Sequence, residues 1–309
     1  MKPYGWCGVF VFGKSLDVFK YFMEVSFCIV NLNAKNYLVK CIKSISKAIK
    51  ECSHEIIIVD NNSKDGSSNF IKNNYPYIKL ITNRYNYGYT KAINQAIKNS
   101  VGNYKVILNP DTMLYQNSIT ILLQFLKNNK KVGIVGPKVI NVDGTFQGSC
   151  KRGLAKPLAV FSYFLGLSNL FPNEKKYSEY HLSHQDENKI NEVSGVSGSC
   201  MVIRKCVIDK IGLFDERYFA YQEDSDFCLR TQKAGWKVYY NPQSVVMHVG
   251  GRGGSNAVPY RSIYEWHRSY YIYYFKFFSK SYSVVFNIFY VAIMFGKLIF
   301  ATINHFLRS

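Results

Sequence analysis

The chain has 309 residues, of which 48% are apolar and 19% are charged. These values exclude an intrinsically disordered protein and allow one large domain, or one domain with an appendage. Lys and Arg number 39 against 20 Asp and Glu, which gives a formal net charge of +19. We therefore expect an anionic partner: a phosphorylated substrate, an acidic membrane surface or a nucleic acid.

Residues 1–22 contain one short apolar run, from Trp6 to Phe12. It is too short to span a bilayer and no small-residue cleavage pattern follows it, so we do not interpret it as a signal peptide. Regular patterning begins just after Met23, which makes 1–22 either an appended helix or an upstream start. The eight cysteines form no C-x-x-C pair and mostly lie in apolar runs, as is typical of core residues in a reducing cytosol.

From residue 25 onward, apolar strand-like runs alternate with segments of helical periodicity. This alternation predicts an α/β fold with a mostly parallel sheet that is covered by helices on both faces. The predicted strands are VSFCIVN, EIIIVD, IKLIT, YKVILNPD and GIVGPKVI, and the first four end in Asn31, Asp60, Asn83 and Asp111. Since ligands of open α/β sheets bind beyond the carboxyl ends of the strands, we expect these polar residues to converge on one site.

Residues 150–194 lose clear periodicity, which predicts a functional loop or a small subdomain. The segment GSCMVIRK then resumes as a strand and is followed by YFAYQEDSDFCLR, which places Glu223, Asp224 and Asp226 within four positions. If a helix starts near Gln222, acids in its first turn would stabilise it by interacting favourably with the helix dipole. Gly235 would end that helix. A structural role therefore competes with a catalytic one for each of the three acids.

Two strand-to-helix turns are candidates for nucleotide binding. In VDNNSKDGS, Asp60 can accept hydrogen bonds from a base or from a ribose hydroxyl, although the same residues also make ordinary turns. In NYGYTKAIN, Gly88 lies at the turn, with Lys91 and Asn94 in the helix that follows. No G-x-G-x-x-G or P-loop accompanies a strand-to-helix junction, so we expect a metal ion to neutralise a bound diphosphate.

The metal candidates are Asp111 and His248. Asp111 follows Pro110 at the end of an apolar strand, and His248 lies between another strand and a Gly-rich loop. Carboxylate and imidazole groups are suitable ligands for a divalent cation. A lone His after a strand also commonly has a structural role.

In their order, VDNNSKDGS, NYGYTKAIN, LNPD, GSCMVIRK, FDERYFAYQEDSDFCLR and the late His resemble the inverting family 2 glycosyltransferases, and within them the rhamnosyltransferase-like branch. The resemblance covers roughly residues 24–275. It implies a GT-A fold with a Rossmann-like nucleotide-sugar-binding sheet, a dTDP- or UDP-sugar donor and Mg²⁺ or Mn²⁺. The implied reaction is inverting transfer of rhamnose or a related hexose to a hydroxyl of a glycan or lipid-linked glycan acceptor in cell-surface polysaccharide synthesis.

The resemblance also implies the roles of individual residues. Asp224 is the expected catalytic base with Glu223 beside it, Asp111 and His248 are the expected metal ligands, and Asp226 serves structure by pairing with Arg230. One departure is Asn109, which stands at the first position of the family's D-x-D motif. The residues expected to contact the donor are Asn31, Asp60, Asn62, Gly88, Lys91, Asn94 and Asn109.

We expect a transferase domain over residues 23–262, with 150–194 on the acceptor side, and a helical tail over 263–309. The tail is dense in Tyr and Phe with Lys276 and Lys280 between them, and its uninterrupted apolar part is about 14 residues. Such a segment is short of the roughly 20 residues that span a bilayer, so we expect it to lie on the anionic inner face of the cell membrane. The protein would then be cytoplasmic and peripheral, and a homo-oligomer is left open.

Two other functions compete with sugar transfer. A nucleotidyltransferase that makes nucleotide sugars would share the fold but would have a Gly-rich loop near its first strand. This chain has VNLNAKN there. A basic protein that binds nucleic acid or a membrane surface without catalysis would explain the charge. It would leave the acids at the strand ends unexplained, because they repel phosphate, and we therefore expect no nucleic-acid partner.

Overall fold

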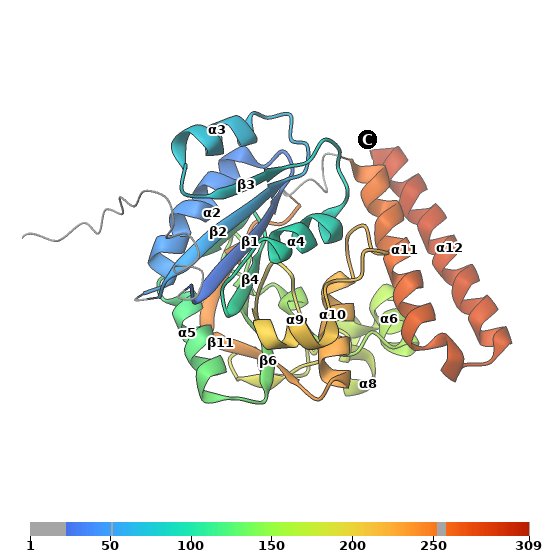
Figure 1. Ribbon diagram of the computed structural model, residues 1–309. Helices are drawn as coiled ribbons and strands as arrows, with labels where there is room; N and C mark the ends of the chain where they lie inside the picture. Colours follow the sequence, from blue (N-terminus) through green and yellow to red (C-terminus); the bar gives the residue numbers. More distant parts are fainter. Residues whose placement is uncertain (1–22, 51, 252–257, 309) are drawn as a thin grey trace, which may run out of the picture.

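The computed structural model describes residues 23–50, 52–251 and 258–308 (Figure 1). The expectations for residues 1–22 lie outside these ranges. The main sheet has the order β3-β2-β1-β4-β10-β6-β11-β5, and β8 also pairs with β11. Its strands are β1 (Val25–Asn31), β2 (His54–Asp60), β3 (Lys79–Thr82), β4 (Tyr104–Leu108), β5 (Thr112–Leu114), β6 (Val132–Ile140), β8 (Asn191–Glu192), β10 (Cys200–Arg204) and β11 (Lys237–His248).

The mostly parallel α/β sheet predicted from the sequence is confirmed. Strands β3, β2, β1 and β4 are mutually parallel, and β11 is parallel to β6. Three strands run antiparallel to their neighbours: β10 between β4 and β6, and β5 and β8 beside β11. A second, two-stranded sheet joins β7 (Lys151–Arg152) to β9 (Gly195–Val196).

Helices cover both faces of the sheet (Figure 1). Helices α2 and α5 pack together on one face, whereas α4 lies on the other face with α9 and α10. The apolar spacing explains this packing: α2 buries Leu38, Cys41, Ile42, Ile45 and Ala48, which recur three and four positions apart. The helices of this part are α2 (Lys35–Ala48), α3 (Ser67–Asn74), α4 (Tyr89–Lys98), α5 (Ser118–Asn128), α9 (Lys205–Ile211) and α10 (Glu223–Lys233).

Residues 150–194 form a small, largely helical region. It contains α6 (Pro157–Phe164), α7 (Leu167–Leu170) and α8 (Lys175–Ser178), between β7 and β8. These helices are too short to give a periodic sequence pattern. Their buried residues join a second apolar cluster, separate from the core of the main sheet, that includes Val160, Tyr180 and Tyr270.

The chain ends in a helical hairpin of α11 (Pro259–Phe277) and α12 (Val284–Arg308), with α12 on the outside (Figure 1). The predicted domain boundary after residue 262 therefore falls inside α11. The expectation that the aromatic residues of α11 face lipid headgroups is wrong for Tyr270, Tyr273 and Tyr274, which are buried against the rest of the protein. They share one face because they are three and four positions apart.

The helical part of the tail is longer than its uninterrupted apolar run of about 14 residues. Helix α12 has 25 residues, and its most apolar 18-residue stretch has a mean hydropathy of 2.1. Among the described residues it is the one helix long and apolar enough to cross a membrane. Lys297 interrupts the apolar run but does not interrupt the helix.

Candidate functional site

A cavity of about 410 Å³ lies beyond the carboxyl ends of β1 and β4. This is the edge of the sheet where the sequence places the site. Its wall combines strand ends, the start of α10, the 150–194 region and α11. The predicted site residues that line it are Asn109, Asp111, Glu223, Asp224 and His248.

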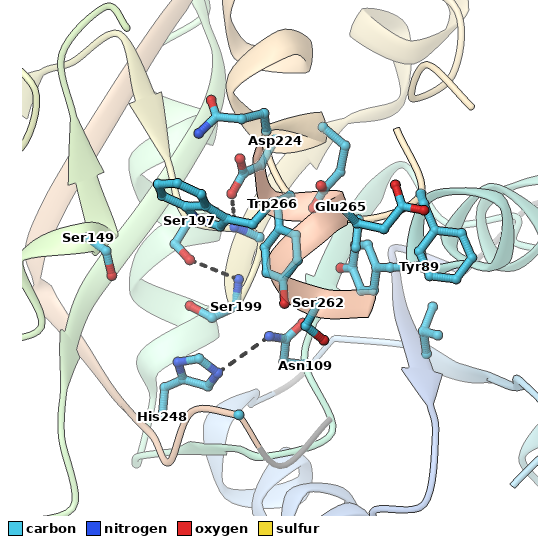
Figure 2. A pocket seen from close by; sticks show the side chains of 18 of the residues that line it. Tyr89, Asn109, Ser149, Ser197, Ser199, Asp224, His248, Ser262, Glu265 and Trp266 are labelled. Carbon is cyan, nitrogen blue, oxygen red and sulfur yellow. Dashed lines mark hydrogen bonds between the residues drawn. The ribbon is translucent and has the colours of Figure 1, made fainter. Parts of the chain in front are cut away.

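At one end of the cavity, Asp111 and His248 converge. Oδ1 of Asp111 is 3.2 Å from Nε2 of His248, and Asn109 Nδ2 is 3.4 Å from the same nitrogen (Figure 2). The other ring nitrogen, Nδ1, lies 2.9 Å from the amide oxygen of Gln147. Because that oxygen only accepts hydrogen bonds, Nδ1 donates to it, and Nε2 faces Asp111 and the amide of Asn109.

This pair fits a divalent cation that is shared with a substrate. No group of three or more His, Cys, Asp or Glu side chains in the described residues forms a metal cage of its own. Mg²⁺ is commonly held by one or two protein groups together with substrate phosphates. A hydrogen bond such as that from Nδ1 to Gln147 is what orients the imidazole in many metal sites of proteins.

At the other end, Asp224 is held by several donors. Its Oδ2 accepts hydrogen bonds from the guanidinium of Arg152 and from the backbone N–H of Gly198 at 2.9 Å. Its Oδ1 accepts one from the backbone N–H of Ser225 at 2.7 Å. Both members of the Arg152–Asp224 ion pair are buried, so the carboxylate has one fixed orientation.

Glu223 has different surroundings from its neighbour. Burial, and then the negative charge of Asp224, raises the pKa of Glu223 to about 8. At neutral pH Glu223 is therefore protonated and can donate a hydrogen bond. A buried acid with a raised pKa beside a second acid is typical of sites that carry out acid–base chemistry.

Asp226 has the structural role predicted for it. Its Oδ1 is 2.6 Å from Nε of Arg230, one turn along α10. Its Oδ2 accepts hydrogen bonds from Lys276 of α11 and from Tyr218. Asp226 thus ties α10 to α11 and does not line the cavity.

Asp60 and Asn31 lie behind the cavity wall. Asn31 Nδ2 donates to Asp60 Oδ2 at 2.8 Å, and Asp60 Oδ1 accepts from the backbone N–H of Ser63 at 2.9 Å. The next residue, Asn61, does line the cavity and donates to Asn86 Oδ1 at 2.8 Å. The sequence thus located the right turn, and the structure brings Asn61 and Asn86 to the cavity surface.

Four other candidates for donor binding are not among the lining residues. Asn94 is buried, and its side-chain amide donates to the backbone carbonyl of Phe214 and accepts from the backbone N–H of the same residue. Gly88 has φ +88°, and a Cβ there would be 2.6 Å from Phe219. Lys91 lies over the ring of Tyr87, and Asn62 accepts from Lys64. The contacts of Asn94 and Gly88 are structural, and the donor-binding roles of Lys91 and Asn62 remain predictions.

Several lining residues were not found from the sequence. They are Arg152, Asn61, Asn86, Tyr180, Gln222, Glu265 and Trp266. Arg152 lies in the region without periodicity, and Glu265 and Trp266 lie in a tail that we expected to face the membrane. No local pattern connects these segments to the acids of α10, since only the tertiary fold brings them together.

The chain matches two family models. Residues 26–212 match "Glycosyl transferase family 2", and residues 160–308 match "Glycosyl transferase family group 2". The second match includes α11 and α12, which the structure packs against the catalytic region.

One similar protein is the N-acetylglucosaminyl-diphospho-decaprenol L-rhamnosyltransferase of Mycobacterium tuberculosis, which is 28% identical over 204 residues. That match covers 62% of this chain and 66% of the relative, so it spans just under two thirds of the relative's length.

Solved structures share the fold. A mannosyltransferase from Pyrobaculum calidifontis, in complex with GDP-Man and Mn2+, has a TM-score of 0.56 at 14% identity, over 82% of this chain and 64% of the other. TarS 1-349 from S. aureus, in complex with UDP, has a TM-score of 0.53 at 14% identity, over 81% of this chain and 65% of the other.

The solved structures confirm the GT-A fold, and the family models and the mycobacterial protein confirm the resemblance to the rhamnosyltransferase-like branch. The chain belongs to glycosyl transferase family 2.

Proposed function

We propose that this protein transfers a sugar, rhamnose or a related hexose, from a nucleoside diphosphate donor to a hydroxyl of a lipid-linked glycan, with inversion at the sugar carbon. The observation that supports this most is the arrangement of the cavity. It has a metal-binding pair, Asp111 and His248, at one end and two buried acids, Glu223 and Asp224, at the other. A nucleoside diphosphate sugar presents phosphates and a sugar to these two ends.

In this proposal Asp224 is the general base. The carboxylate accepts the proton of the attacking acceptor hydroxyl, and its fixed orientation favours attack from one side of the sugar. Glu223, protonated at neutral pH, donates a hydrogen bond to a substrate oxygen. Arg152 keeps Asp224 in position and balances its charge.

Asp111 and His248 would hold Mg²⁺ or Mn²⁺. Such a cation, when bound, offsets the negative charge of the departing diphosphate. With these two ligands from the part of the chain that the structure describes, coordination positions would be left for phosphate oxygens and water. The Pyrobaculum relative with GDP-Man and Mn2+ supports this assignment by analogy.

The acceptor is inferred from the relative and from the tail. The mycobacterial protein is named for a diphospho-decaprenol substrate. In this chain, α12 exposes an apolar face, with Ile288, Phe295, Phe300 and Phe306 more than half exposed. We infer that this face inserts into the inner surface of the cell membrane, beside a lipid-linked acceptor.

The packing of α12 favours a position in the interface over a transmembrane one. The ring centres of Tyr290 and Tyr274 of α11 are 3.8 Å apart, and the two rings are stacked. Near the other end of α12, the ring centres of His305 and Tyr260 are 4.8 Å apart. Helix α12 is thus held along α11, and α11 is buried against the catalytic region. To cross a bilayer it would have to leave these contacts.

A donor screen tests the function. Purified protein is incubated with a lipid-linked acceptor and a panel of dTDP- and UDP-sugars that includes dTDP-rhamnose, and the released nucleoside diphosphate is measured with Mg²⁺, Mn²⁺ or EDTA. We expect one donor to be turned over in a metal-dependent way. Asp111→Asn should lower this activity strongly, whereas Asp143→Asn, at an exposed turn, should not. Turnover that survives both EDTA and Asp111→Asn contradicts the metal site, and no turnover with any donor contradicts the function.

A further inference from the structure

The two residues before α10 have an unusual backbone. Tyr221 has φ +68° and Gln222 has φ +58°, although neither is glycine. Left-handed backbone is unfavourable for such side chains and persists where the surroundings enforce it, often at functional sites. Gln222 is 4% exposed and lines the cavity. The strained turn therefore places a buried amide in the wall of the site.

Two tyrosines from distant segments orient this amide. Gln222 Nε2 donates to the hydroxyl of Tyr180 at 3.0 Å, and that hydroxyl is 2.6 Å from the hydroxyl of Tyr270. Tyr180 belongs to the 150–194 region and Tyr270 to α11. Because the amide nitrogen is fixed on this side, the amide oxygen, Oε1, points away from the tyrosines.

Within the described residues, Gln222 Oε1 has no hydrogen-bond partner, although it is buried. The same holds for three other buried oxygen atoms of cavity-lining residues: Glu223 Oε2, Ser199 Oγ and Tyr89 Oη. Figure 2 places Tyr89, Ser199 and Asp224 around the same cavity. A buried polar atom without a partner is costly, so this group is suited to a ligand with several hydrogen-bonding groups.

The charge of this end defines the class of ligand. Glu223 and Asp224 are both acids, and the guanidinium of Arg152, which also lines the cavity, is already paired with Asp224. A phosphate group beside this pair would be repelled by the Asp224 carboxylate. A neutral ring with several hydroxyls can donate to Gln222 Oε1 and accept from Ser199 and Tyr89.

We propose that Gln222 is a specificity-determining residue whose Oε1 accepts a hydrogen bond from one hydroxyl of a sugar ring bound in this cavity. Tyr180 and Tyr270 are positioning residues that fix the amide. This inference rests on the proposed function and deepens it. The sugar is that of the donor or that of the acceptor, and the experiment distinguishes the two.

The test uses the donor that the screen above selects, together with monodeoxy analogues of the donor sugar and of the acceptor sugar. The variants are Gln222→Met, which removes the oxygen and keeps the length, and Tyr180→Phe, which removes the hydroxyl that holds the amide. Gln232→Met is the matched control, because Gln232 lies on α10 but bonds the backbone of Val193 and does not line the cavity. The measured quantity is the ratio of kcat/KM for the parent sugar to that for each analogue.

We expect the wild-type protein to reject the analogue that lacks one particular hydroxyl by about tenfold to a hundredfold. Gln222→Met should lose this preference at that position alone, Tyr180→Phe should weaken it, and Gln232→Met should keep it. If Gln222→Met loses the preference within the donor analogues, the hydroxyl belongs to the donor sugar. If it loses the preference within the acceptor analogues, the hydroxyl belongs to the acceptor.

If active Gln222→Met and Tyr180→Phe proteins keep the wild-type preference at every position, the inference is wrong while the proposed function stands. Tyr180→Phe alone decides the matter if Gln222→Met does not fold. A wild-type protein that turns over no donor refutes the proposed function and, with it, this inference.

Discussion

Glu223 and Asp224 are consecutive residues with opposite surroundings. Asp224 accepts hydrogen bonds from Arg152 and from two backbone N–H groups, whereas Glu223 has a buried oxygen without a partner in the described residues. This contrast allows one acid to be an oriented acceptor of protons and the other a neutral donor at the same pH.

Replacement of Asp224 by Asn should affect both activity and stability. We expect transfer to fall by at least a hundredfold, since a general base is removed. We also expect a loss of about 3 kcal/mol in the free energy of unfolding, because Arg152 becomes a buried cation without a counterion. Activity assays and urea unfolding measure the two effects.

The double variant Arg152→Met, Asp224→Asn separates the two roles. It removes both charges, so most of the lost stability should return while transfer stays abolished. If the double variant regains activity, or if Asp224→Asn retains more than about a tenth of the wild-type rate, Asp224 is not the base.

Glu223 gives the stability of the protein a pH dependence. Its pKa is raised from 4.5 to about 8 by burial and by Asp224, so the folded state keeps a proton that the unfolded state has lost. The stabilising effect is fully present below about pH 4.5 and is lost as the pH rises toward 8, at about 1.4 kcal/mol per pH unit.

We therefore expect Glu223→Gln, which cannot ionise, to be progressively more stable than the wild type between pH 5 and about pH 8, with no further gain above. Thermal unfolding of both proteins across this range measures the difference. Parallel stability curves would show that Glu223 is ionised in the folded protein at neutral pH. Glu216→Gln is a control, because Glu216 is also an acid but does not line the cavity.

The sequence predicted that certain residues at the ends of strands and helices would lie together at one site. Asp111, His248, Glu223 and Asp224 interrupt or follow apolar runs, and all four line the cavity. Arg152 and Gln222 could not be predicted, because their roles depend on partners that are tens of residues away. Asn94 and Gly88 have sequence contexts like those of ligand-binding residues, but they pack against the segment before α10.

Among the elements, the long periodic ones were predicted and the short ones were not. Helices α2, α3, α4 and α10 begin where apolar spacing and turn residues place them. The orientation of β10 could not be predicted, since an antiparallel central strand has the same apolar pattern as a parallel one. The role of α11 was misjudged because aromatic residues suit a protein core as well as a membrane surface.

One contact joins α12 to the wall of the cavity. Lys297 lies in the middle of this apolar helix, with its Nζ 4.6 Å from the ring centre of Trp266 and 4.3 Å from that of Phe164. Trp266 lines the cavity and Phe164 belongs to α6. A cation over two rings thus connects α12, α11 and the 150–194 region.

We expect Lys297→Met to lower the free energy of unfolding by about 1–2 kcal/mol, since it removes this cation and keeps the apolar stem. The matched control is Lys280→Met, because Lys280 is exposed between the two helices. Chemical unfolding compares the two variants with the wild type. Equal stability of all three proteins would show that the rings do not stabilise the lysine.

At the scale of the whole molecule, the fold places an acid-lined cavity and an apolar outer helix on either side of α11. Trp266 and Tyr270 line the cavity and belong to α11, the helix that precedes α12 in the chain. The net charge of +19 favours an anionic surface, and the exposed face of α12 supplies the apolar area that attachment needs. A cut at residue 262 would remove buried tyrosines of α11, so substitutions on α12 are the better test of membrane binding.

We expect the wild-type protein to bind vesicles that contain anionic lipid, and Phe295→Glu with Phe300→Glu to weaken this binding at least tenfold. These side chains are 62% and 71% exposed, so the change should spare the fold, and each loses the free energy of about 1.5–3 kcal/mol that an inserted Phe provides. Cosedimentation with anionic and with neutral vesicles, at low and high salt, measures the binding. High salt should weaken but not abolish it, because the apolar part is not screened.

The control for this prediction is the pair Tyr77→Glu and Val142→Glu. These residues are similarly exposed, at 70% and 66%, but lie outside the helical hairpin, and they add the same two negative charges. If the control binds as weakly as the α12 variant, net charge alone governs attachment and α12 does not insert. If both variants bind like the wild type, the membrane surface is elsewhere.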